Sequence, residues 1–116
     1  MAALTAITPV NGGVASTGAA VAATDTVAQS VLGVGGAFLE IINGGGSTNT
    51  VTISDAGATP AGNSLASGTI TTTITAGASK VFRLRNEQVT PATGLITITN
   101  SFTTTVTYKL YPVGLV

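Results

Sequence analysis

The sequence contains no cysteine, no histidine and no tryptophan. Without cysteine and histidine, the chain cannot form disulfides, thiol nucleophiles, Ser-His pairs or zinc sites of the usual kind. The four carboxylates lie on separate segments, with no spacing that indicates a catalytic pair or a calcium loop. We therefore expect a protein that is not an enzyme, with no catalytic residues, no cofactor and no metal site. The carboxylates are Asp25, Glu40, Asp55 and Glu87.

Charge is also scarce, since charged residues make up 7% of the chain and the formal net charge is zero. A nucleic-acid-binding domain normally carries a basic surface, which this composition does not supply. Disorder normally combines low hydrophobicity with high net charge, whereas 44% of these residues are apolar. The length of 116 residues suits one domain. We expect one folded domain that does not bind nucleic acid.

The sequence also lacks a long hydrophobic run. The first ten residues contain no Lys or Arg, and Pro9 interrupts them, which is unlike a secretory signal. The alanine-rich stretch 14–23 is shorter than the ~20 apolar residues that span a bilayer. The absence of cysteine is consistent with assembly in a reducing cytoplasm. We expect no membrane association, while a processed extracellular protein remains the alternative.

What the sequence does contain is threonine, at 22 residues, together with much valine and isoleucine. These β-branched residues favour strands. In six segments, apolar residues alternate with threonine or other polar residues, which is the period of a half-buried antiparallel strand. The segments are 37–42, 49–54, 68–75, 79–85, 94–100 and 103–111. The alternation predicts a threonine-covered outer surface and an apolar inner one.

Short strands separated by glycine-containing turns predict an all-β fold, a single antiparallel β-sandwich that is either Ig-like or jelly-roll-like. Residues 43–46, Asn-Gly-Gly-Gly, predict a hairpin loop, because no helix or lysine follows to make them a phosphate-binding loop. The body should span 31–116, and 1–30 should form an extended N-terminal arm with room for one strand at 4–10. The predicted core is Leu39, Ile41, Val51, Ile53, Ile70, Ile74, Phe82, Leu84, Ile96, Ile98, Val106 and Tyr108.

Two groups of residues are candidates for contact with a partner. In the arm, Leu4, Ile7, Val10 and Val14 are apolar but cannot build a core of their own, so we expect them to pack against a partner by strand addition. Three of the four cations, Lys80, Arg83 and Arg85, lie within six residues. They are either a docking patch or charges that protect an edge strand from aggregation.

The strand-rich part of the chain, residues 37–111, resembles small head decoration (cement) proteins of tailed bacteriophages. The resemblance rests on Phe38-Leu-Glu-Ile-Ile-Asn-Gly-Gly-Gly46, Val51-Thr-Ile53, Ile74-Thr-Ala-Gly-Ala-Ser-Lys-Val-Phe82 and Gly94-Leu-Ile-Thr-Ile98. It implies a virion structural protein on the outer capsid surface, assembled in the host cytoplasm. Its partners would be the major capsid protein and, in a homo-oligomer, two sister copies of a trimer. The alternative is an extracellular or fibre-associated binding module that recognises protein or carbohydrate.

Overall fold

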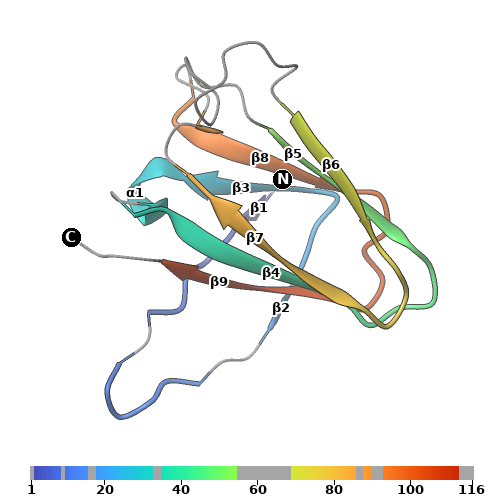
Figure 1. The fold of residues 1–116 in the computed structure, drawn as a ribbon, viewed down its shortest axis with the longest axis horizontal. Coiled ribbons are helices and arrows are strands. Elements are labelled where there is room, and N and C mark those ends of the chain that lie inside the picture. Colours follow the sequence, from blue (N-terminus) through green and yellow to red (C-terminus); the bar gives the residue numbers. More distant parts are fainter. Residues whose placement is uncertain are drawn as a thin grey trace.

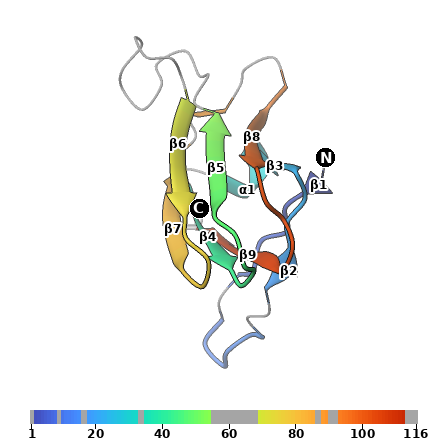
Figure 2. The same ribbon diagram turned by 90° about the vertical axis from the view of Figure 1, so that its right-hand side faces the viewer.

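The computed structural model describes residues 2–8, 10–15, 18–32, 35–54, 69–85, 88–89 and 93–112. Two sheets pack face to face, one above the other in Figure 1 and again in Figure 2. Sheet A has the order β1-β3-β8-β5-β6, and sheet B has the order β2-β9-β4-β7. The predicted all-β sandwich is confirmed. Its elements are β1 (Ala2–Ala3), β2 (Ala19–Ala20), β3 (Thr24–Ala28), α1 (Gln29–Leu32), β4 (Ala37–Asn43), β5 (Asn49–Ser54), β6 (Thr69–Ile74), β7 (Ser79–Leu84), β8 (Leu95–Asn100) and β9 (Val106–Pro112).

The core lies between the two sheets, where the apolar side of each alternating strand faces inward. Burial of these side chains supplies the main stabilising free energy of such a fold. Most of the predicted core is confirmed as buried, namely Leu39, Ile41, Val51, Ile53, Ile74, Leu84, Ile96, Ile98, Val106 and Tyr108.

Two predicted core residues are less buried than expected. Ile70 is 41% exposed, and Phe82 is only half-buried although it packs against the core. Both lie on edge strands, β6 and β7, which diverge from the connection at residues 75–78 (Figure 1). An inward side chain on an edge strand has a neighbouring strand on one side only. Where the strand also diverges from the opposite sheet, part of that side chain stays in contact with water.

The predicted boundary between arm and body does not match the sheet arrangement. β3 lies inside the stretch 1–30, yet it sits between β1 and β8 and pairs with β8 over all its residues. No strand forms over 4–8; the paired residues are Ala2–Ala3, parallel to β3. The alternation of β3 is hidden in the sequence by Asp25, which is 1% exposed. Its carboxylate accepts hydrogen bonds from the Ala22 backbone N–H at 3.1 and 3.2 Å.

The connection from β4 to β5 is not the predicted hairpin, because the two strands belong to different sheets. Residues 44–46 also have no positive φ among them, unlike Gly13, Gly36, Gly77 and Gly94. Glycine is needed here for close approach instead. A Cβ on Gly45 would lie 2.4 Å from the Thr104 carbonyl oxygen and 2.4 Å from the Phe102 ring. Gly44 and Gly45 therefore let this crossing connection pack against the loop between β8 and β9.

Candidate protein-interaction surface

The outer surface of sheet A is covered by hydroxyl groups. The strand register aligns Thr71 of β6, Thr52 of β5, Thr99 of β8 and Thr24 of β3 in one row across the sheet. This confirms the predicted threonine-covered outer surface for sheet A. We call it the hydroxyl face; its described members are Thr24, Thr50, Thr52, Ser54, Thr71, Thr73, Thr97 and Thr99.

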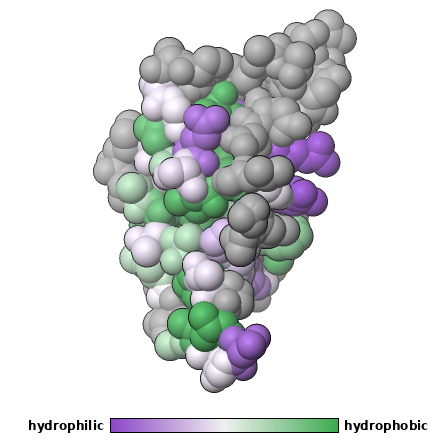
Figure 3. Space-filling model, turned by 90° about the vertical axis from the view of Figure 1, so that its left-hand side faces the viewer, coloured by the Kyte–Doolittle hydropathy of each residue, from purple (hydrophilic) through white to green (hydrophobic). Residues whose placement is uncertain are grey.

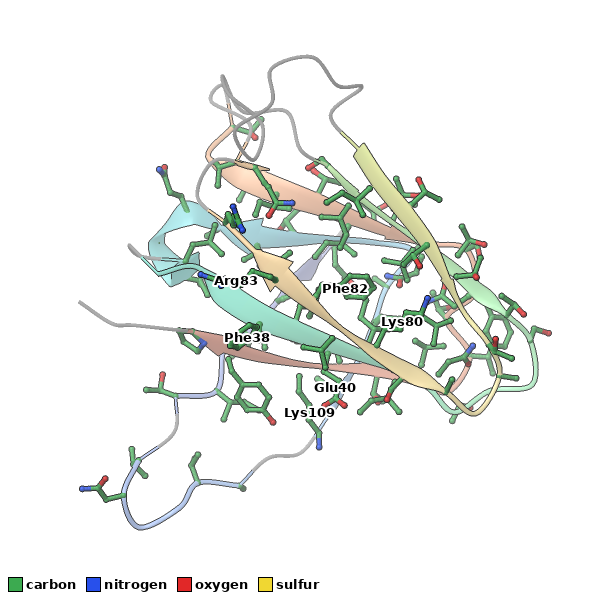
Figure 4. All side chains as sticks on the ribbon, in the orientation of Figure 1. Phe38, Glu40, Lys80, Phe82, Arg83 and Lys109 are labelled. Carbon is green, nitrogen blue, oxygen red and sulfur yellow. The ribbon has the colours of Figure 1, made fainter. Side chains whose placement is uncertain are left out.

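The outer surface of sheet B is different, because it combines aromatic, aliphatic and charged side chains. One row across the sheet contains Arg83, Phe38 and Tyr111, and the next contains Val81, Glu40 and Lys109. Figure 4 shows Glu40 and Lys109 below the strands, whereas Phe82 points up between the sheets. We call this surface the mixed face; its members are Phe38, Glu40, Ile42, Val81, Arg83, Thr107, Lys109 and Tyr111.

Large apolar side chains are exposed on the mixed face, with Phe38 at 41% and Val81 at 62% exposure. Arg83 lies over Phe38, its guanidinium carbon 5.6 Å from the ring centroid, and its Nη2 donates to the Gly35 carbonyl oxygen at 3.0 Å. Aromatic residues and arginine are enriched among the residues that dominate protein–protein binding energy. Because Arg83 is already held in place, it would lose less side-chain entropy in a contact with another protein than a free arginine would.

A loop projects from the edge of β9 on the same side of the molecule as the mixed face. Its two ends are fixed there, since the Ile7 backbone N–H donates to the Leu110 carbonyl oxygen at 2.7 Å and Ala19 pairs with Tyr108. Figures 1 and 2 show it extending beyond sheet B, away from sheet A. In Figure 3 it forms the lower tip, where hydrophobic residues (green) lie at the surface beside a hydrophilic one (purple). We call residues 10–15 the projecting loop.

The four predicted contact residues of the arm divide into anchors and exposed groups. Leu4 is buried in the core, and its backbone N–H donates to the Thr26 carbonyl oxygen at 2.8 Å. Ile7, which precedes the projecting loop, is half-buried. Val10 and Val14 are 58% and 48% exposed. Within this group, only Val10 and Val14 are therefore placed to contact a partner, while Leu4 and Ile7 hold the segment to the sandwich.

The three clustered cations do not form one patch. The register places Lys80 opposite Ile41 on the inner side of edge strand β7, where its Nζ donates to Thr72 Oγ1 of β6 at 2.9 Å. An inward-pointing charge on an edge strand opposes sheet-to-sheet aggregation, so Lys80 fits the edge-protection interpretation. Arg83 belongs to the mixed face. Arg85 is exposed beyond the end of β7, and its backbone N–H donates to Gln88 Oε1 at 2.7 Å.

Sequence reasoning did not single out Phe38, Val81 and Tyr111 as candidate contact residues, although the signal was present. Period-two alternation assigned Leu39 and Phe82 to the inside, which puts Phe38 and Val81 outside. A large apolar residue at an outward position was the clue to the mixed face.

Sites of other kinds do not emerge from the described part of the chain. No group of three or more Asp or Glu side chains there could hold a metal ion. No helix among the described residues is long and apolar enough to cross a bilayer. Burial raises the pKa of the Asp25 carboxyl above its ordinary value of 3.8, although the hydrogen bond from the Ala22 backbone N–H opposes this rise.

Comparison with known proteins adds no relative: no family model matches the chain, and no curated protein or solved structure is significantly similar to it.

Proposed function

We propose that this protein is a non-enzymatic virion structural protein that binds the outer surface of a phage capsid and stabilises contacts between major capsid protein subunits. One structural observation carries the proposal. The projecting loop, with exposed Val10 and Val14, lies on the same side of the sandwich as the mixed face. A loop and a sheet face on one side can engage two neighbouring surfaces at once. The sequence resemblance to head decoration proteins supplies the identity of the partner.

The chemistry of the two faces supports this orientation. The hydroxyl face is uncharged and readily hydrated, and suits the side exposed to solvent. The mixed face combines apolar side chains and Arg83, which are typical of the centre of a protein contact, with Glu40 and Lys109, which suit its polar rim. Each copy need bind only weakly, because a copy that bridges two capsid subunits benefits from multivalency. Sister copies would form a homo-oligomer, a trimer in the arrangement that the resemblance implies.

A module that recognises carbohydrate is less well supported. Sugar-binding sites commonly present an open aromatic ring with polar groups around it. Here Arg83 lies over the Phe38 ring and occupies one of the two ring faces. A protein surface, which can pack around the stacked Arg83–Phe38 pair, is the better match.

The test is co-sedimentation of the purified protein with empty shells of the phage whose genome encodes it. Saturable binding at a fixed ratio to the major capsid protein is the expected result. Absence of binding to complete, expanded shells would overturn the proposal. A glycan array run in parallel would then identify a carbohydrate-binding module.

A further inference from the structure

The dipeptide Asn-Gly occurs twice in the chain, at residues 11–12 and 43–44. In this dipeptide the glycine backbone nitrogen can attack the side-chain amide carbon of asparagine. A new N–C bond closes a succinimide ring, and the amide nitrogen leaves as ammonia. Water then opens the ring to give aspartate or isoaspartate. Glycine favours the attack because it has no side chain to obstruct it. The dipeptide alone therefore predicts the same reactivity at both asparagines.

The structure prevents this reaction at Asn43. Its side chain is fully buried, and its Nδ2 donates to the Ser47 carbonyl oxygen at 2.7 Å and to the Ile74 carbonyl oxygen at 2.9 Å. Its Oδ1 accepts from the Gly45 backbone N–H at 3.0 Å. The attacking nitrogen is also held, because the Gly44 N–H donates to the Thr105 carbonyl oxygen at 3.0 Å. Ring closure would have to break these hydrogen bonds inside the sandwich.

Asn11 is in the opposite situation. It is exposed in the turn of the projecting loop, where the Gly13 N–H donates to the Val10 carbonyl oxygen at 2.9 Å. That turn leaves the Gly12 nitrogen and the Asn11 amide without a hydrogen bond to any other described residue. Apart from Gly12 and its two neighbours in the chain, no residue places an atom within 4 Å of the position a Cβ on Gly12 would take, so the backbone has room to rotate. Both residues are exposed to water, and no hydrogen bond within the described part of the chain holds either reacting group in place.

We propose that Asn11 is a site of spontaneous deamidation in the folded protein, whereas Asn43 is protected. The product carries a new carboxylate between Val10 and Val14, in a loop that otherwise has no charged residue. Burying an unpaired carboxylate against a partner is costly. Deamidation therefore weakens the capsid contact made by the loop, a consequence that rests on the proposed function.

Mass spectrometry of protein incubated at mildly alkaline pH tests the chemistry without any partner. We expect the mass of the fragment containing Asn11 to shift with time to that of the form with a carboxylic acid in place of the amide. The mass of the fragment containing Asn43 should stay unchanged. In urea both fragments should convert, which shows that the fold and not the local sequence protects Asn43. The Gly12→Ala variant should convert more slowly at Asn11. Equal rates at both positions in the folded protein, or conversion of Asn11 only in urea, would overturn the proposal.

Binding to empty shells tests the consequence. Freshly purified, incubated and Asn11→Asp proteins are compared, and the last two should bind more weakly than the first. Incubation should not change the affinity of the Asn11→Gln variant relative to its own fresh sample. Equal affinity of the fresh and Asn11→Asp proteins for the shells would refute the proposal that deamidation weakens the capsid contact. If no form binds shells, the proposed function fails, while the mass measurements still decide the deamidation.

Discussion

Replacing both exposed valines of the projecting loop by threonine tests whether this loop contacts the capsid. Threonine is isosteric with valine and also β-branched, so Val10→Thr and Val14→Thr preserve the shape and backbone preference of the loop. Each exchange replaces one methyl group by a hydroxyl. Because both side chains are largely exposed in the free protein, its stability should change little.

The expected loss of affinity follows from the exposed fractions, 58% for Val10 and 48% for Val14. A buried methyl group contributes about 0.8 kcal/mol, and burying an unpaired hydroxyl costs about 1–3 kcal/mol. Since about half of each side chain remains to be buried on binding, each exchange should cost about 1 kcal/mol. The double variant should lose about 2 kcal/mol, which is roughly a thirty-fold increase in Kd.

Sedimentation with a limiting amount of empty shells, titrated with the wild-type protein and the double variant, measures this Kd. The matched control is Thr71→Val, which makes the reverse exchange on the hydroxyl face and should bind as the wild type does. All three proteins should have nearly the same melting temperature. Wild-type affinity in the double variant would refute the role of the loop, and altered affinity in Thr71→Val would move the contact to sheet A.

Three further predictions concern the sandwich itself. Gly77→Ala should lower the free energy of unfolding in urea by about 1–2 kcal/mol, because the φ of Gly77 is +82°. Gly36→Ala should lower it further, since the new Cβ would also lie 2.2 Å from the Leu84 carbonyl oxygen. An equal loss in the two variants would contradict this account. Burial raises the pKa of Asp25 above 3.8, so the stability that the protonated carboxyl contributes should be lost as pH rises from 3.8 through its folded-state pKa. Unfolding midpoints should show that Asp25→Asn gains stability relative to the wild type over that range. A constant difference between the two proteins would argue against a raised pKa. Lys80→Met should increase the self-association measured by light scattering, whereas Lys80→Arg, which keeps the charge, should not. The absence of an increase in Lys80→Met would argue against edge protection.

The sequence predicted the parts of this fold that depend on local alternation. Side chains two apart share a face of a strand, so the inward positions of β4, β5, β8 and β9 follow from the order of residues alone. The same rule assigned the threonines to the hydroxyl face. It missed β3, where the buried Asp25 interrupts the pattern, because a carboxylate can be buried once a backbone N–H binds it.

The candidate surface was predictable only in part. Val10 and Val14 were identified, but Leu4 was grouped with them although it lies in the core. An apolar residue in an irregular segment carries no local sign of whether its own fold will cover it. That depends on the edge of β3, to which the Leu4 backbone binds.

The sequence by itself determined that this chain is a β protein, since β-branched residues at period two leave little alternative. It also determined that no chemistry here can use a cysteine thiol or a histidine imidazole, because the chain contains neither residue. Tertiary structure decided which strands share a sheet, and so made the connection after β4 a crossing between sheets and not a hairpin. It also makes two identical Asn-Gly dipeptides differ, since Asn43 forms hydrogen bonds with residues distant in the sequence while Asn11 does not within the described part of the chain. Those partners come from chain segments that only folding brings together.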